Sequence, residues 1–166
     1  FLSLYDHFAP KLLRHAFFRL GSDEEAKDVV AQVFLKTWEY LCDSKRQSSI
    51  KNIRAFLYQL ANNQIIDSYR KKSRTEVPLK NSEPLKALLV DNNPFEQEQH
   101  RFDAEKVLQA ASLLREDYKT ILLWRYLDEL SITEISEAMG KSRGAVSVML
   151  YRALNDLKKI LKKMGF

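Results

Sequence analysis

Glycine and proline are scarce in this sequence, and three of its four prolines fall within one short stretch, residues 75–98. With only four glycines in 166 residues, the chain lacks the frequent turns that sandwiches, barrels and propeller blades require. Proline removes a backbone donor and disfavours helix at the preceding residue, so residues 75–98 are predicted to be a linker. We therefore expect an all-α protein of two small helical domains, residues 1–74 and 99–166, joined by this Pro-containing linker.

Composition narrows the class of protein further. Hydrophobic residues make up 45% and charged residues 30% of the chain, which predicts a packed core rather than wholesale disorder. The single cysteine, Cys42, cannot form an internal disulfide or a cysteine-based zinc site, so a cytoplasmic location is expected. No apolar run is long enough to cross a bilayer, and no membrane insertion is expected. The given sequence begins at Phe1 rather than at a methionine, so it does not exclude a segment before Phe1.

Positive charge is concentrated in two segments of the chain. Residues 44–74 hold eight basic residues and one acidic residue, and residues 141–166 hold seven and one. Between them, residues 77–100 carry two basic and four acidic residues. This segregation suits a polyanion that is contacted at two separated places, because each neutralised phosphate releases counterions. Two solvated helix faces are the alternative interpretation.

The first domain is predicted to contain three helices. The first covers residues 2–20 and ends at Gly21. Ser22, followed by Glu25 three residues later, forms a capping box that opens the second helix. An apolar stripe along this second helix consists of Val30, Val33, Phe34, Trp38 and Leu41. Leu35 lies off the stripe, so its side chain is expected to be exposed.

The third helix is predicted to be apolar on one side and polar on the other. The buried side consists of Phe56, Leu57, Leu60, Ala61 and Ile65, and the polar side of Asn63, Asp67, Arg70 and Arg74. This polar side combines amide and basic groups. Such a surface can hold one strand of a nucleic acid by its backbone while unstacked bases are captured, as the opening of a duplex requires.

The second domain contains a helix-turn-helix pattern. Ser131 and Glu134 form a capping box that opens a helix of about two turns, which ends at Gly140. Ser142 then caps a longer basic helix. Two helices joined by a tight turn that contains glycine are typical of this DNA-binding motif. In that geometry the second helix offers to the major groove Arg143, Ser147, Val148 and Tyr151, with Lys141 and Arg152 near phosphates or base edges.

Both domains, in this order, resemble bacterial extracytoplasmic-function sigma factors of the sigma-70 family. Residues 28–38 resemble the region-two segment that docks on the clamp helices of the RNA polymerase beta-prime subunit. Residues 53–63 and 67–72 resemble the part that reads and melts the promoter minus-ten element. Residues 127–157 are similar to region four, whose helix-turn-helix binds the minus-thirty-five element.

The resemblance implies an alternative sigma factor that is not an enzyme. It would bind core RNA polymerase, at the beta-prime clamp helices and the beta subunit, and direct promoter recognition, promoter melting and transcription initiation. It implies no cofactor, no metal and no catalytic residue. An anti-sigma factor is the further partner that the resemblance implies. The expected location is cytoplasmic, on the nucleoid when active or held at the membrane by an anti-sigma factor.

The resemblance also assigns residues to three surfaces. The minus-ten surface consists of Asn62, Asn63, Asp67, Arg70, Lys71 and Lys72. The polymerase surface consists of Asp28, Gln32, Leu35 and Lys36. The minus-thirty-five surface consists of Lys141, Ser142, Arg143, Ser147, Val148, Tyr151 and Arg152.

The chain departs from the family pattern at a few positions. Ala31 and Gln32 stand where the family usually has Gln and then Glu. Ser147 and Met149 stand where basic residues are frequent. Fewer phosphate contacts predict weaker, less salt-sensitive binding there, or a different upstream element.

Two other classes of function compete with this interpretation. A free-standing helix-turn-helix regulator, whose first domain senses a ligand or dimerises, accounts for the second domain but not for the basic, amide-bearing helix at residues 62–74. An enzyme that acts on nucleic acid has little support, because the sequence shows no carboxylate cluster, zinc motif or phosphate-binding glycine loop. The three histidines, His7, His15 and His100, have no metal-ligand spacing.

Overall fold

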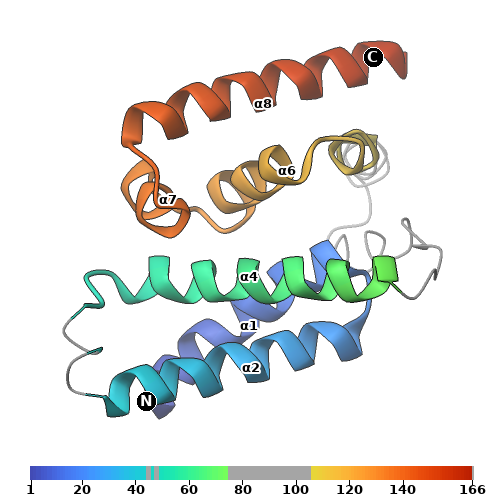
Figure 1. Cartoon of the computed structure of the whole chain (residues 1–166). Helices are drawn as coiled ribbons and strands as arrows, with labels where there is room; N and C mark the ends of the chain where they lie inside the picture. Colours follow the sequence, from blue (N-terminus) through green and yellow to red (C-terminus); the bar gives the residue numbers. More distant parts are fainter. Residues whose placement is uncertain (44–45, 47–48, 75–105, 166) are drawn as a thin grey trace, which may run out of the picture.

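The computed structural model describes residues 1–43, 46, 49–74 and 106–165 of the chain. Within these ranges all regular elements are helical, which confirms the all-α class (Figure 1). The predicted linker, residues 75–98, lies outside the described residues. None of the helices in the described part is both long and apolar enough to cross a membrane.

Three helices form the first layer of the molecule. They are α1 (Leu2–Leu20), α2 (Asp23–Cys42) and α4 (Ile53–Arg74), and each of them packs on the other two (Figure 1). Helix α1 continues through Pro10, which is exposed. It ends at Gly21, whose φ of 74° is a left-handed conformation that glycine adopts without a steric penalty.

The predicted start of α2 is confirmed, and its predicted apolar stripe is confirmed in part. Val30, Val33 and Phe34 are buried. The stripe is wrong at Trp38, whose side chain is 51% exposed. Thr37 takes the place in the core instead, because the helix turns this position inward and the buried hydroxyl donates to the Val33 carbonyl at 2.7 Å. A buried polar group that is bonded in this way carries little desolvation cost.

The second layer consists of shorter elements and one long helix. Residues 106–112 are helical and are followed by α6 (Glu116–Leu122), which continues directly into the π-helical turn η2 (Leu123–Leu127). Helix α7 (Ile132–Met139) and helix α8 (Arg143–Lys163) come next. Helix α8 packs on both α6 and α7 and spans the outer side of the molecule (Figure 1).

The capping residues predicted around α7 and α8 are confirmed. The Ser131 hydroxyl accepts from the Glu134 backbone N–H at 3.1 Å, and the Glu134 carboxylate accepts from the Ser131 N–H at 2.8 Å. Gly140 ends α7 with a φ of 62°, and the Ser142 hydroxyl then accepts from the Ala145 N–H at 3.2 Å. These local interactions fix the tight turn between α7 and α8, which is the helix-turn-helix.

The two layers pack against each other and share one continuous core. Helix α4 contacts α7 across the boundary between the layers. Tyr58 from the first layer and Trp124 from the second are both fully buried there, with ring centroids 6.3 Å apart in an edge-to-face arrangement. The chain therefore forms two small helical domains that lie in direct contact.

Candidate nucleic-acid and protein interfaces

The residues assigned to the minus-thirty-five surface lie together at the start of α8 and in the turn before it. All seven are exposed, namely Lys141, Ser142, Arg143, Ser147, Val148, Tyr151 and Arg152. Val148 and Tyr151 are large side chains that are 50% and 68% exposed, on the side of α8 away from its buried residues Val146, Leu150 and Ala153. The Ser147 hydroxyl donates to the Arg143 carbonyl at 3.0 Å, which leaves the lone pairs of this exposed oxygen available as acceptors. This end of α8 offers cations, an apolar side chain and a phenol on one convex surface.

The residues assigned to the minus-ten surface lie along α4 in two environments. Asn63, Asp67, Arg70 and Lys71 are exposed, and Asp67 pairs with Arg70 at 3.7 Å. Lys72 is half-buried, and its ammonium lies 2.8 Å from the Glu25 carboxylate on α2. This ion pair links the last turn of α4 to α2.

Asn62, assigned to the same surface, points to the other side of α4. It is half-buried, and its side-chain oxygen accepts from the Arg19 guanidinium at 3.3 Å. Arg19 in turn contacts the second layer, so Asn62 lies at the boundary between the layers, whereas Asn63 faces solvent.

The residues assigned to the polymerase surface lie on the outer side of α2. Asp28 and Gln32 are exposed, Lys36 is half-buried, and Leu35 is 52% exposed, which confirms the expected exposure of this leucine. Its neighbour Trp38 is also exposed. The outer side of α2 therefore presents two large apolar side chains next to charged and amide groups, a composition that suits a protein interface.

An open groove of about 520 Å³ joins two of these surfaces. Asp28 and Gln32 line it from α2, and Lys71 lines it from α4. The structure thus brings members of the polymerase surface and the minus-ten surface to the same groove between α2 and α4.

A cluster of buried polar residues between the layers was missed by sequence reasoning. Asp128, which follows the π-helical turn, is 4% exposed. One carboxylate oxygen bonds to His15 Nδ1 at 2.7 Å, and the other accepts from the Tyr58 hydroxyl at 3.0 Å. The Arg14 guanidinium lies 3.8 Å from the same carboxylate and donates to the Leu127 carbonyl at 2.8 Å.

Burial determines the protonation of Tyr58. Burial, reinforced by the negative charge of Asp128, raises the pKa of the Tyr58 hydroxyl far above its usual value, although Arg54 and Arg14 oppose this. The phenol therefore stays protonated and donates its hydrogen bond to Asp128 over the physiological pH range.

Two further arginines of the first layer reach the second. The Arg19 guanidinium is buried and donates to the Thr120 hydroxyl at 2.8 Å and to the Glu116 carboxylate at 3.0 Å. Arg54 donates to the Asp128 carbonyl and lies 3.6 Å from the Glu134 carboxylate. No sequence signal identifies these residues, because each partner lies on the other domain and dozens of positions away in the chain.

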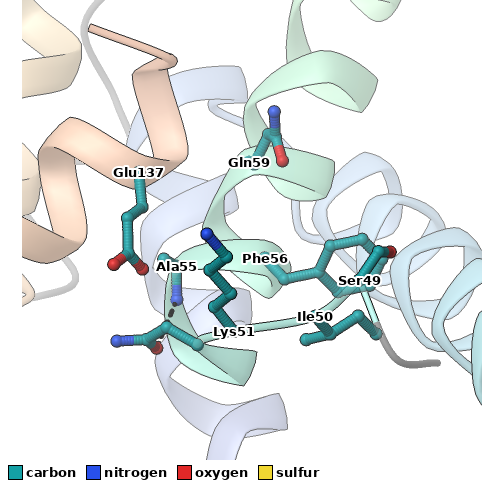
Figure 2. A pocket seen from close by; sticks show the side chains of 8 residues that line it. Ser49, Ile50, Lys51, Ala55, Phe56, Gln59 and Glu137 are labelled. Carbon is teal, nitrogen blue, oxygen red and sulfur yellow. Dashed lines mark hydrogen bonds between the residues drawn. The ribbon is translucent and has the colours of Figure 1, made fainter. Parts of the chain in front are cut away.

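A small pocket of about 240 Å³ lies where the loop before α4 meets α7. Ser49, Ile50, Lys51 and the first turns of α4 line it, and Glu137 closes one side from α7 (Figure 2). The second layer thus covers part of the start of α4.

In the part of the chain that the structure describes, no group of histidine, cysteine and carboxylate side chains is placed to hold a metal ion. The three surfaces described above are two separated basic regions, one on α4 and one on α8, and the outer side of α2, where two large apolar side chains lie beside charged and amide groups.

Comparison with known proteins decides the family. The model of sigma-70 region 2 matches residues 4–75, and that of sigma-70 region 4 matches residues 104–157. The chain belongs to the sigma-70 family. Its relatives place it in the extracytoplasmic-function group, so it is an alternative sigma factor, whose role is promoter recognition. Sigma factors are non-enzymatic transcription initiation factors.

Two curated relatives give the extent of the similarity. The extracytoplasmic-function sigma factor BldN of Streptomyces coelicolor is 27% identical over 158 residues, which cover 95% of this chain and 59% of BldN. The sigma factor YlaC of Bacillus subtilis is 29% identical over 161 residues, which cover 96% of this chain and 91% of YlaC. The chain therefore spans about three fifths of the first relative and most of the second.

A solved structure shows the same fold. The sigma factor RpoE of Bartonella quintana, crystallised with the anti-sigma factor NepR, matches with a TM-score of 0.70 at 19% identity. The match covers 98% of this chain and 96% of that one.

Proposed function

We propose that this sigma factor binds core RNA polymerase through residues 1–74 and places both of its domains on promoter DNA. The outer side of α2, with Asp28, Gln32, Leu35 and Lys36, contacts the beta-prime clamp helices. The exposed side of α4 holds and melts the minus-ten element, and the start of α8 binds the minus-thirty-five element. Residues 75–98 connect this first domain to the domain at residues 99–166. In the complex they contact the surface of the polymerase, including its beta subunit.

One observation carries this proposal. The two family models match in the order region 2 and then region 4, and each matched segment carries its own exposed basic surface. A regulator that needed only its helix-turn-helix would have no use for the second basic surface on α4. The polar cluster between the layers explains why Asn62 faces inward, so Asn63, Arg70 and Lys71 are the stronger candidates for contact with the minus-ten element.

An anti-sigma factor belongs to the proposal as a further partner. The structural relative RpoE was crystallised with one, NepR. The exposed Leu35 and Trp38 on α2 provide apolar area that such a partner would cover. Promoter binding would place the active protein on the nucleoid, and a membrane-anchored anti-sigma factor would hold the inactive protein at the membrane.

The test combines binding to core polymerase with run-off transcription from a library of bacterial promoters. Leu35→Asp is expected to lower affinity for core polymerase about tenfold or more, because a charge replaces an apolar contact, while stability changes by about 0.5 kcal/mol or less. Leu113→Asp is the matched control, since Leu113 is 68% exposed in the other domain. It should bind polymerase as the parent does.

Other outcomes point to other functions. Unchanged polymerase binding by Leu35→Asp would remove α2 from the interface, and a large loss of stability would make Leu35 a core residue. Tight binding to an isolated duplex half-site, without any association with polymerase, would favour the free-standing regulator.

A further inference from the structure

The outward side of the first half of α8 carries an apolar ridge. Val148 and Tyr151 are 50% and 68% exposed, and the exposed Gly144 precedes Val148 by one turn on the same side of the helix. Each of these three residues comes two positions before a buried residue of α8, which is about 200° of rotation around the helix axis. We call Gly144, Val148 and Tyr151 the α8 ridge. It points away from the core of its own domain.

The glycine of the α8 ridge is not required by the fold. In the described part of the chain, no atom lies within 4 Å of the position that a Cβ would take at Gly144. Glycine is less favourable than alanine inside a helix, because its backbone loses more freedom on folding. A helical glycine with open space around it suits a place where another molecule comes close to the backbone.

The rest of the surface around the α8 ridge is polar and basic. The Ser147 hydroxyl donates to the Arg143 carbonyl at 3.0 Å and therefore lies against the backbone of its own helix. The cations Lys141, Arg143 and Arg152 are all exposed at this end of α8. Apolar groups between cations fit a partner that carries negative charge around a small apolar group. 

The major groove of DNA offers this combination. It is bordered by phosphates and is about 12 Å wide, which is close to the diameter of an α-helix. The methyl group of thymine is the apolar group that bases present in this groove, and the other bases present donors and acceptors. A valine side chain gains contact area from a methyl group, whereas it would leave a donor or acceptor without a partner. Val148 therefore favours thymine over the other bases.

We propose that Val148 is a specificity-determining residue that contacts the methyl group of a thymine in the minus-thirty-five element. This inference rests on the proposed function, in which the start of α8 binds that element. Gly144 lets the helix backbone approach the groove, and Tyr151 extends the apolar contact along it. The upstream element then carries a T·A base pair at one fixed position, which Val148 selects.

The test removes the methyl group and leaves the rest of the promoter unchanged. A promoter obtained from the transcription library is rebuilt with deoxyuridine in place of each thymine of its upstream element, one position at a time. Deoxyuridine differs from thymidine only by the missing methyl group. Holoenzyme that contains the parent chain should bind one of these promoters about fourfold more weakly, which is the loss expected for one buried methyl group.

Two variants with the same substitution decide whether Val148 reads this methyl group. Val148→Ser removes the apolar contact, and the fold is kept because valine and serine have similar helix propensities. Holoenzyme with this variant should bind the thymine and deoxyuridine promoters equally. Val107→Ser is the matched control, because Val107 is 41% exposed in the same domain. It should keep the difference that the parent shows between the two promoters.

Gly144→Ala tests the close approach of the helix separately. The added methyl group has room in the free chain, so the melting temperature should stay the same or rise. On DNA the same group would stand between α8 and the floor of the groove. Binding to the thymine and deoxyuridine promoters should therefore weaken equally, by about tenfold or more.

Each contrary result overturns a stated claim. If no deoxyuridine weakens binding of the parent, or if the weakening persists in Val148→Ser, Val148 does not read a methyl group. If Val148→Ser weakens binding to core polymerase in the absence of DNA, the α8 ridge is a protein contact instead. Parent-like promoter binding by Gly144→Ala would overturn the close approach. A parent chain that does not bind core polymerase would overturn the proposed function, and the inference about Val148 fails with it.

Discussion

Tyr58 shows how one buried side chain couples the stability of the fold to pH. Burial and the adjacent Asp128 carboxylate raise its pKa in the folded chain, while in the unfolded chain the phenol ionises near its usual value of about 10. Below about pH 10 both states hold the proton, and the stability that Tyr58 contributes is fully present. Above about pH 10 only the unfolded state releases the proton, so this stability is lost as the pH rises.

We predict that Tyr58→Phe flattens the alkaline limb of the stability profile. The free energy of unfolding of the parent should fall with an extra slope of about 1.4 kcal/mol per pH unit above about pH 10, and the variant should lack this slope. At neutral pH the variant should lose about 1 to 2 kcal/mol, because Asp128 loses a donor. Denaturant unfolding at a series of pH values between about 9 and 11.5 measures both effects.

The control for this prediction is an exposed tyrosine. Tyr126 is 62% exposed, so Tyr126→Phe should leave the alkaline slope as it is in the parent. Equal slopes in Tyr58→Phe and the parent would contradict the burial of the phenol. Tyr69, whose pKa burial also raises, keeps its own contribution in both chains.

At the scale of single residues, sequence reasoning succeeded where local periodicity decides exposure. Leu35 was expected to be exposed and is exposed. The prediction that Trp38 is buried is wrong. Trp38 continues the apolar stripe at helical spacing, and hydrophobicity alone does not show where such a stripe leaves the buried side of the helix. His15 had no assigned role in the sequence, because its partner Asp128 lies on the other domain.

At the scale of elements, α8 divides into two halves with different surroundings. The first half carries the residues assigned to the minus-thirty-five surface and follows the tight turn at Gly140. The second half carries Lys158, Lys159, Lys162 and Lys163, which make it equally basic. A helix-turn-helix docks the start of its second helix in the groove, so the two halves should differ in function although their charge is similar.

We predict that Arg152→Ala weakens binding of the upstream promoter element about tenfold, as expected for one lost base or phosphate contact. Lys159→Ala is the matched control on the same helix, because its side chain is 73% exposed and lies in the second half. It should change binding by about twofold or less. Footprinting of the polymerase complex on the upstream element measures both, and equal losses would mean that net charge rather than position governs binding.

The elements themselves were largely predictable because their ends depend on local chemistry. The capping box of Ser131 and Glu134, the left-handed Gly140 and the cap at Ser142 all formed as expected. The π-helical turn before Asp128 was not predictable, since no local pattern in residues 123–127 indicates it. The Leu127 carbonyl at its end accepts a hydrogen bond from Arg14 of the first layer, a partner that lies far away in the sequence.

At the scale of the whole molecule, the contact between the domains was not predictable. The sequence indicates two domains and a linker, and it provides no pattern that separates a free domain from a docked one. Arg14 and Leu127 are 113 positions apart, and their contact follows only from the packed layers. The ion pairs across the boundary are likewise invisible in the sequence, because Arg19, Arg54 and Glu116 look like ordinary surface residues of amphipathic helices.

The shared core and the ion pairs between the layers together predict how the whole chain unfolds. Because the buried residues of both layers form one continuous cluster, the parent should unfold in a single cooperative transition. Glu116→Arg places two cations at the contact with Arg19 and should uncouple the layers, which splits this transition into two. Asp117→Arg, in the same first turn of α6, should keep it single, because Asp117 pairs with Arg115 of its own domain. Far-UV circular dichroism reports both domains, and the fluorescence of the buried Trp124, in a Trp38→Phe background, reports the boundary. Coincident curves are expected in the parent and separated curves in Glu116→Arg. Separated curves already in the parent would mean that the layers fold independently and that the ion pair between Arg19 and Glu116 does not couple them.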